Sequence, residues 1–342
     1  MTRLSVRAPL AWFGPGRLVP DARVVFETGM IRDAGPAVEI PAAEQEIEVD
    51  GFLMPAAADR HVHIELSDPV AVLRRGVTAV RDLGWPAERI FNLADASELV
   101  TFNGPLIRAA GPILTSPGGY PTRESWAPAG TGREVAGPQE AAAAVRVLIA
   151  AGATAIKVSL NSEAGPALGD AELMAICDEA AGADIPVTAH AQGAGQVERA
   201  LGAGVLELAH TPWIRLSDDV ITTAAKRMRW VSTLDILSFG RDTPEIRAAL
   251  DNLRRFHQAG GSISYGTDLG NGAVPAGIHT RELFWMRDAG LTNDQVLSAL
   301  IRSPIVRDAP ADLIALASNP LEGLTAFDDI RLVIRSGRVV RP

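Results

Sequence analysis

Short apolar runs alternate with amphipathic helical stretches through residues 56–309, and this alternation constrains the fold more than any other feature of the chain. The runs are DRHVH, GVTAVRDLG, PLIRAAGPIL, TAIKVSL, IPVTAHAQ, VLELAHT, MRWVSTL and SISYGTDLG. Helix-start signals follow two of these runs, at Thr243-Pro244 and at the Thr292/Gln295 capping pair. Eight strands that alternate with helices predict a parallel sheet closed into a (β/α)8 TIM barrel of the α/β class.

The two ends of the chain have a different pattern. Residues 1–55 alternate short β-like runs with Gly and Pro turns and have no helical period. Residues 310–342 behave similarly, with ADLIALAS followed by IRLVIRSGRVVRP and a hairpin signal at Gly337. We therefore expect the two ends to meet in one small sheet domain beside a barrel of residues 56–309.

Composition narrows the class of protein and its partners. The 342 residues are 47% hydrophobic and 21% charged, which is typical of a globular protein. A net charge of −9 gives no electrostatic support for binding nucleic acid or an anionic membrane. Cys177 is the single cysteine, which excludes an internal disulfide and fits a reducing compartment. The N-terminus lacks the order of a signal peptide and no run reaches ~18 apolar residues, so we expect a soluble cytoplasmic protein.

Polar side chains of metal-site type stand at the ends of the predicted strands, where a barrel of this kind carries its active site. They come from five of the eight runs and are His61, His63, Lys157, His190, His210 and Asp268. Alternation along a strand places His61 and His63 on one face. Each residue alone would be an ordinary core or turn residue, but their shared position indicates a metal centre. Imidazoles with carboxylates suit zinc, and also nickel, manganese or iron.

Lys157 is the informative member of this set. It lies inside the apolar run AIKVSL, where an unpaired ammonium costs several kcal/mol. An ammonium has three donors and no acceptor, so it cannot bind a metal. An amine that captured carbon dioxide would become a carbamate, an anionic bidentate group able to bridge two metals. That modification would account for a lysine in this strand.

Taken together, the motifs resemble the metal-dependent amidohydrolase superfamily over nearly the whole chain. The chain looks most like its imidazolonepropionase-related, prolidase-type branch, which has a carboxylated lysine and a binuclear metal centre. The matching elements are PAAADRHVH, GVTAVRDLG, AIKVS, VTAHAQG, LELAH, GTDLG and ADLIALASNPLEG with VIRSGRVV. The resemblance implies that the β-rich ends form the small β-sandwich domain that accompanies the barrel.

The resemblance also implies a ligand set and a mechanism. His61, His63 and Asp268 would hold the more buried metal, His190 and His210 the more exposed one, and carboxylated Lys157 would bridge them. Zinc is the expected metal, with Mn, Fe, Ni and Co as alternatives. A water bound to both metals would ionise near neutral pH and attack a carbonyl. Asp268 would act as general base and then general acid, so Asp268 and Lys157 are the expected catalytic residues.

Substrate contacts are expected on the loops that follow the strands, since mouth loops usually shape selectivity. The candidates there are Tyr120, Arg123, Trp213, Asp235 and His279. Tyr120 stands where the similar branch often has a histidine. Only the short segment IELSDPVAVLRRG joins the first two strands, which should leave the mouth more open than in relatives.

We therefore expect a hydrolase that cleaves an amide-like C–N bond of a small molecule: a dipeptide, N-acyl amino acid, carbamate, urea or cyclic amide. The alternative is a mononuclear deaminase of a heterocycle, which would leave Lys157 without a bridging role. Deaminases commonly add a glutamate near the fifth-strand histidine, and AHAQGAG has none. Lactone or ester hydrolysis at the same centre stays open, as does assembly into a homo-oligomer. A non-catalytic scaffold would be expected to have lost some of these ligands, and all six are present.

Overall fold

A computed structural model describes residues 3–341, and its larger part is the predicted barrel. Its parallel strands are β6 (Ala57–Val62), β7 (Val77–Asp82), β8 (Leu106–Ala109), β9 (Ile113–Thr115), β11 (Ile156–Asn161), β12 (Val187–Gln192), β13 (Glu207–Leu208), β14 (Arg229–Val231) and β15 (Ser262–Ser264). All eight predicted runs contain a strand. The third is divided into β8 and β9, because Gly111 has a positive φ of 75° and Pro112 has no N–H to donate. A short outer strand, β10 (Gly132–Glu134), pairs with β9.

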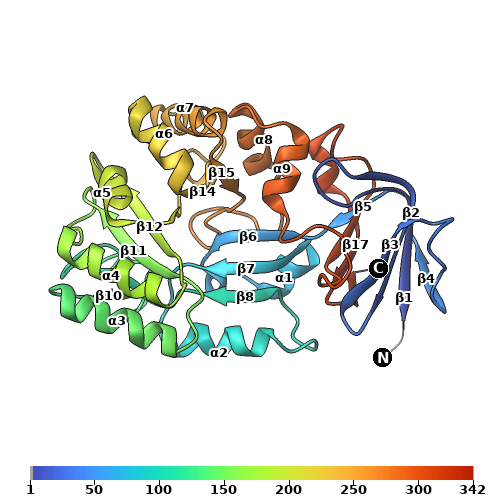
Figure 1. Ribbon diagram of the computed structural model, residues 1–342, viewed down its shortest axis with the longest axis horizontal. Coiled ribbons are helices and arrows are strands. Elements are labelled where there is room, and N and C mark those ends of the chain that lie inside the picture. Colours follow the sequence, from blue (N-terminus) through green and yellow to red (C-terminus); the bar gives the residue numbers. More distant parts are fainter. Residues whose placement is uncertain (1–2, 342) are drawn as a thin grey trace.

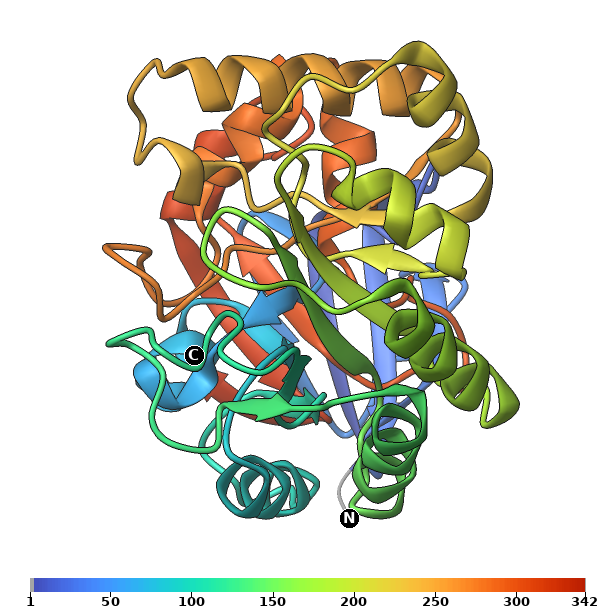
Figure 2. The same ribbon diagram turned by 90° about the vertical axis from the view of Figure 1, so that its left-hand side faces the viewer.

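Helices follow the strands and form an outer ring (Figures 1 and 2). They are α1 (Pro69–Arg74), α2 (Ala87–Ser97), α3 (Pro138–Ala150), α4 (Asp170–Gly182), α5 (Gln196–Ala203), α6 (Asp218–Arg227), α7 (Pro244–Gln258), α8 (Thr280–Asp288) and α9 (Asn293–Leu300). The predicted start signals are confirmed: Thr243 caps α7 with Pro244 in its first turn, and Thr292 and Gln295 form a capping box on α9. Among residues 3–341, no helix has the length and apolar character that a membrane span requires.

Hydrogen bonds outside the regular ladders close the barrel. At one seam, the Arg60 amide on β6 donates to the Tyr265 carbonyl just after β15, at 3.0 Å. At the other, the Thr154 amide before β11 donates to the Ala109 carbonyl at the end of β8, at 2.9 Å. β9 adds a parallel pairing with β11 at the same seam. The parallel strands therefore present their C-terminal ends at one mouth.

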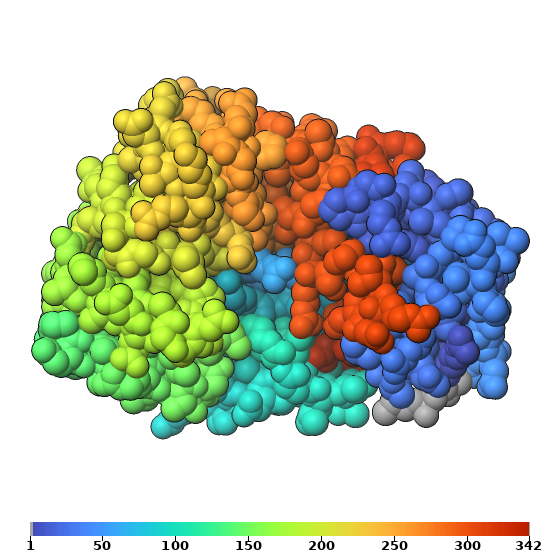
Figure 3. All heavy atoms as spheres, viewed as in Figure 1, coloured from blue at the N-terminus to red at the C-terminus, as the bar shows by residue number. Residues whose placement is uncertain are grey.

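The two ends of the chain form a β domain at one end of the molecule, where their blue and red residues meet in Figure 3. Its strands are β1 (Leu4–Trp12), β2 (Leu18–Glu27), β3 (Met30–Pro36), β4 (Gln45–Glu48), β5 (Phe52–Pro55), β16 (Leu313–Leu316), β17 (Ile330–Arg335) and β18 (Arg338–Arg341). They belong to one eight-stranded sheet in which β16 pairs with β5. The turn at Gly337, with a φ of 74°, joins β17 to β18 as the predicted hairpin.

Candidate metal centre

Three predicted ligands converge at the mouth of the barrel. His61 and His63 come from the end of β6, and Asp268 follows β15. The Nε2 atoms of both histidines lie 3.4 Å from Asp268 Oδ1, and one ligand atom from each residue lies within 4.8 Å of the others. Backbone hydrogen bonds to the end of β6 fix the loop after β15. The Asp268 amide donates to the His61 carbonyl at 2.8 Å, and the His63 amide donates to the Leu269 carbonyl at 2.7 Å. Asp268 adopts a left-handed backbone, with φ of 58°.

Backbone carbonyls orient both imidazoles of this group. His61 Nδ1 donates to the Ala209 carbonyl at 2.8 Å, and His63 Nδ1 donates to the Gly84 carbonyl at 2.9 Å. A carbonyl only accepts, so each Nδ1 carries a proton, and each Nε2 faces Asp268. Burial alone would lower the pKa of His63, but its hydrogen bond with Asp268 and the charge of that carboxylate raise it. Metal-binding histidines commonly have this arrangement: one ring nitrogen donates to a protein group, and the other is directed at the position of the metal.

Charge also favours a cation between these side chains. Burial alone would raise the pKa of Asp268, but the adjacent His61 and His63 hold it well below its usual range, so the carboxyl is anionic. Burial, with the nearby Lys157 charge, lowers the pKa of His61 well below its ordinary value. His61 is therefore neutral, which is the form that binds metals. The residues present fit a divalent metal ion.

His190 and His210 extend the cluster to the next two strands. The His210 ring centroid lies 4.6 Å from that of His61 and 4.8 Å from that of His190. His210 Nδ1 hydrogen-bonds with the Thr233 hydroxyl at 2.9 Å, and His190 Nε2 lies 3.2 Å from the Asn161 amide nitrogen. Burial lowers the pKa of His210 to about 3. Burial likewise lowers the pKa of His190 well below its ordinary value, so both imidazoles are neutral and each has a polar partner.

Lys157 lies on β11 between these two groups of strands and is 1% exposed. Its ammonium nitrogen has no hydrogen-bond partner among residues 3–341. Burial lowers its pKa to about 7, so a large fraction is the neutral amine at physiological pH. The neutral amine is the nucleophilic form, and a buried nitrogen without a partner leaves room in the hydrogen-bonding scheme for a modified side chain.

Aromatic side chains surround the imidazoles, and two of them are predicted substrate contacts. Tyr120 stacks on His190 with ring centroids 4.9 Å apart. The Trp213 ring lies 6.4 Å from that of His190 and 6.2 Å from that of His210. Trp126, from the loop between β9 and β10, packs on His63 at 4.7 Å. These rings form an apolar rim around the cluster.

The other predicted substrate contacts are placed differently. His279 Nε2 lies 2.6 Å from Asp235 Oδ2, and Asp235 also accepts from Arg281 and Trp285. Both members of the pair are buried, at 1% exposure for Asp235 and 6% for His279. Arg123 is exposed on the loop after β9. Only Tyr120 and Trp213 of the five candidates contact the histidine cluster directly.

Several side chains outside the predicted ligands and substrate contacts support the cluster. Asn161 shares a face of β11 with Lys157, and Thr233 follows β14, so reading the strand ends further would have found both. Asp82 accepts from the Ile64 amide at 2.8 Å and the Gly84 amide at 3.1 Å, which connects the ends of β6 and β7. Trp126 lies in an irregular loop and has no periodic signal.

The model of the amidohydrolase family matches residues 52–300 of the chain. This span contains every barrel strand and all six predicted ligands. A search of curated protein sequences gave no match.

Solved structures share the fold over essentially the whole chain. A. niger ochratoxinase has a TM-score of 0.85 and 22% identity, covering 100% of this chain and 96% of that one. A Xaa-Pro dipeptidase with bound methionine has a TM-score of 0.84 and 22% identity, covering 100% of both chains. A prolidase complexed with N-methylphosphonate-L-proline has a TM-score of 0.80 and 23% identity, covering 99% of this chain and 100% of that one.

Proposed function

Because the chain belongs to the amidohydrolase family, whose members hydrolyse carbon–nitrogen bonds, we propose that it cleaves an amide-like bond of a small molecule at a centre of two divalent metal ions. The substrate class proposed is a dipeptide, N-acyl amino acid, carbamate, urea or cyclic amide. Two solved structures of the same fold are a Xaa-Pro dipeptidase and a prolidase, which supports the choice of a peptide-like bond. Zinc is the proposed metal, because neutral imidazoles and a carboxylate are its preferred ligands.

One observation carries the proposal: four imidazoles, an anionic carboxylate and an unpartnered lysine meet at the C-terminal mouth of the barrel, all at most 8% exposed. We assign His61, His63 and Asp268 to one metal and His190 and His210 to the other. Lys157 would bridge them after carboxylation: its nitrogen bonds to the carbon of carbon dioxide and releases one proton, leaving an anionic carbamate. This reaction converts the neutral buried amine into an anion, which two metals would stabilise.

The bound metals would activate water and polarise the carbonyl of the substrate. The chain's own contribution is to position groups around that carbonyl. Asp268 is proposed to accept a proton from the attacking water and to deliver it to the leaving nitrogen. Tyr120, after β9, and Trp213, after β13, lie beside His190 and are proposed to hold the substrate and to exclude bulk water.

The test is reconstitution with zinc and bicarbonate, followed by metal analysis and an activity screen. We expect about two metals per chain and turnover of at least one class among dipeptides, N-acyl amino acids, carbamates and lactams. One metal per chain with deamination of a heterocycle would support the mononuclear alternative instead. Turnover of lactones alone would replace the amide by an ester as the substrate bond. The proposal would be overturned if the reconstituted protein bound no metal and turned over none of these compounds.

A further inference from the structure

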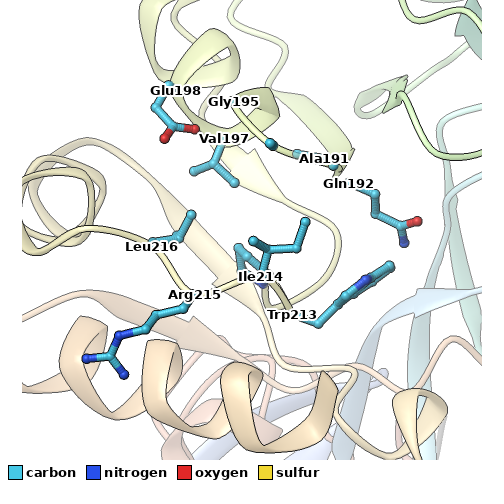
Figure 4. A pocket seen from close by; sticks show the side chains of 12 residues that line it. Ala191, Gln192, Gly195, Val197, Glu198, Trp213, Ile214, Arg215 and Leu216 are labelled. Carbon is cyan, nitrogen blue, oxygen red and sulfur yellow. The ribbon is translucent and has the colours of Figure 1, made fainter. Parts of the chain in front are cut away.

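A pocket lies directly beside the histidine cluster, between the loop from β12 to α5 and the loop from β13 to α6 (Figure 4). It begins at Ala191 and Gln192, the two residues that follow His190 on β12. Its opposite side is formed by residues 212–216, which follow His210. The pocket is therefore built from the two loops that leave the proposed ligands of the more exposed metal.

The pocket and the cluster share a wall. Trp213 lines the pocket, and its ring also lies 6.4 Å from the His190 ring and 6.2 Å from the His210 ring. Gln192 lines it too, and accepts a hydrogen bond at 3.0 Å from Asn161, the residue that contacts His190. A substrate whose carbonyl lies at the histidines would have its neighbouring substituent next to this wall.

The interior of the pocket is apolar. Val197, Ile214 and Leu216 point toward its middle, as Figure 4 shows. Gly193 and Gly195 contribute only backbone to the lining. The volume is about 130 Å³, close to the ~150 Å³ of an apolar protein cavity known to hold a benzene ring. Its size suits one ring or one branched alkyl group.

The charges at the rim disfavour an anion. Glu198 is exposed at the edge of the pocket. Arg215 is the one cationic side chain of the lining, but it points away from the middle in Figure 4 and pairs with Asp251 at 2.7 Å. A carboxylate-bearing substituent would therefore meet an apolar surface and a like charge, without a free cation.

We infer that this pocket, here called the β12–β13 pocket, receives an uncharged, ring-sized apolar substituent of the substrate, such as the side chain of phenylalanine or leucine in an N-acyl amino acid or dipeptide. The inference rests on the proposed function for the position of the reacting carbonyl. It narrows the substrate class to compounds with such a group next to the scissile bond. Small or acidic residues at that position are expected to be poor substrates.

Ile214 is the residue to change, because it points into the pocket and is 39% exposed, so the fold can accommodate a substitution there. Ile214→Trp should fill the pocket and Ile214→Ala should enlarge it. The probes are N-acetyl-phenylalanine, N-acetyl-alanine and N-acetyl-aspartate, with Phe-Gly, Ala-Gly, Gly-Phe and Gly-Ala to vary each side of the bond. Calorimetric affinity and kcat/KM are measured on the zinc-loaded protein.

Wild-type protein should prefer phenylalanine to alanine by about tenfold or more in at least one series, and aspartate should be the weakest probe. Ile214→Trp should lower that preference by about tenfold, and Ile214→Ala should move it toward larger rings. Val306→Trp is the matched control, because Val306 is also 39% exposed and lies outside the pocket; its preference should equal that of wild type.

The affinity measurements test the inference about the pocket, and the turnover measurements test the proposed function. Either one can therefore fail without the other. The inference about the pocket would be overturned if wild-type protein showed no preference for phenylalanine in any series. It would also be overturned if neither Ile214→Trp nor Ile214→Ala changed that preference. A preference in affinity without turnover of any probe would retain the pocket and count against the proposed function. Circular dichroism on each variant identifies one that has not folded, and the other Ile214 variant then decides.

Discussion

The two halves of the candidate metal centre are held by the chain in different ways. In the half made by His61, His63 and Asp268, both outer imidazole nitrogens donate to backbone carbonyls and the ligand atoms already lie within 4.8 Å of one another. In the other half, His210 depends on the Thr233 hydroxyl, and the Lys157 nitrogen has no partner among residues 3–341. Backbone carbonyls cannot be removed by substitution, whereas a hydroxyl or an amine can. The second half should therefore be the more sensitive to single changes in side chains.

The largest expected effect, however, is in the first half and concerns turnover rather than binding. Asp268→Asn keeps an oxygen ligand of similar size but removes the proposed proton acceptor. We expect kcat to fall by about 10²–10⁴-fold while most of the metal is retained. Steady-state kinetics with metal analysis of the same sample tests this. Asp268→Glu is the conservative control, which should recover part of the rate if the carboxylate matters. Full activity of Asp268→Asn would remove Asp268 from proton transfer.

Removing the Lys157 amine should abolish metal binding in the second half of the centre and leave metal binding in the first half intact. For Lys157→Ala we expect metal content to fall from about two to about one per chain and kcat/KM to fall at least about 100-fold, more than the loss of a residue that only orients a ligand. Acetate or formate should restore part of both, because a small carboxylate can occupy the place of the carbamate. Arg146→Ala, an exposed cation on α3, is the control. Two metals and normal turnover in Lys157→Ala would contradict the bridging role.

Thr233 offers a smaller test of the same half. Thr233→Val removes the hydroxyl that hydrogen-bonds with His210 Nδ1 but keeps the shape of the side chain. The affinity for the second metal should fall about 10–100-fold, and that for the first should hold. Thr233→Ser keeps the hydroxyl and should bind like wild type. Competitive titration with a chelating dye measures both sites. Equal weakening of the two sites would show that the halves are not independent.

The contrast between the halves also explains which parts of the site could be predicted from the sequence. His61, His63 and Asp268 stand at or beyond the C-terminal ends of strands, where alternation and barrel topology place side chains without knowledge of any contact. Lys157 is instead the second residue of β11, and its position inside an apolar run is what marks it. Periodicity therefore predicts the barrel and where its ligand-type side chains cluster. The division of the third run into β8 and β9 depends on Gly111 and a local backbone conformation that periodicity does not report.

Tertiary pairing could not be predicted in the same way. Asp235 and His279 lie on the expected mouth loops, yet they are 44 residues apart and pair with each other. Trp126 reaches His63 from an irregular loop. Such contacts depend on how long loops fold over the barrel, and loop conformation has no repeating pattern of side chains. The orienting carbonyls of Gly84 and Ala209 belong to the backbone, which any residue supplies, so no residue type marks them.

The smallest expected effect is at the Asp235–His279 pair, and it tests whether the metal centre ends where the imidazole cluster ends. Arg281→Gln removes two of the donors to Asp235, while His279 at 2.6 Å and Trp285 at 3.2 Å remain. The Arg281 side chain is 47% exposed, so solvent screens its charge and we expect a loss of about 1 kcal/mol in the free energy of unfolding. Metal content should stay at about two per chain, and kcat/KM should change less than about threefold, since the pair lies outside the proposed ligand set. Chemical denaturation and kinetics at one pH measure both quantities. A tenfold loss of kcat/KM with unchanged stability would extend the functional site to this pair and support Asp235 and His279 as substrate contacts.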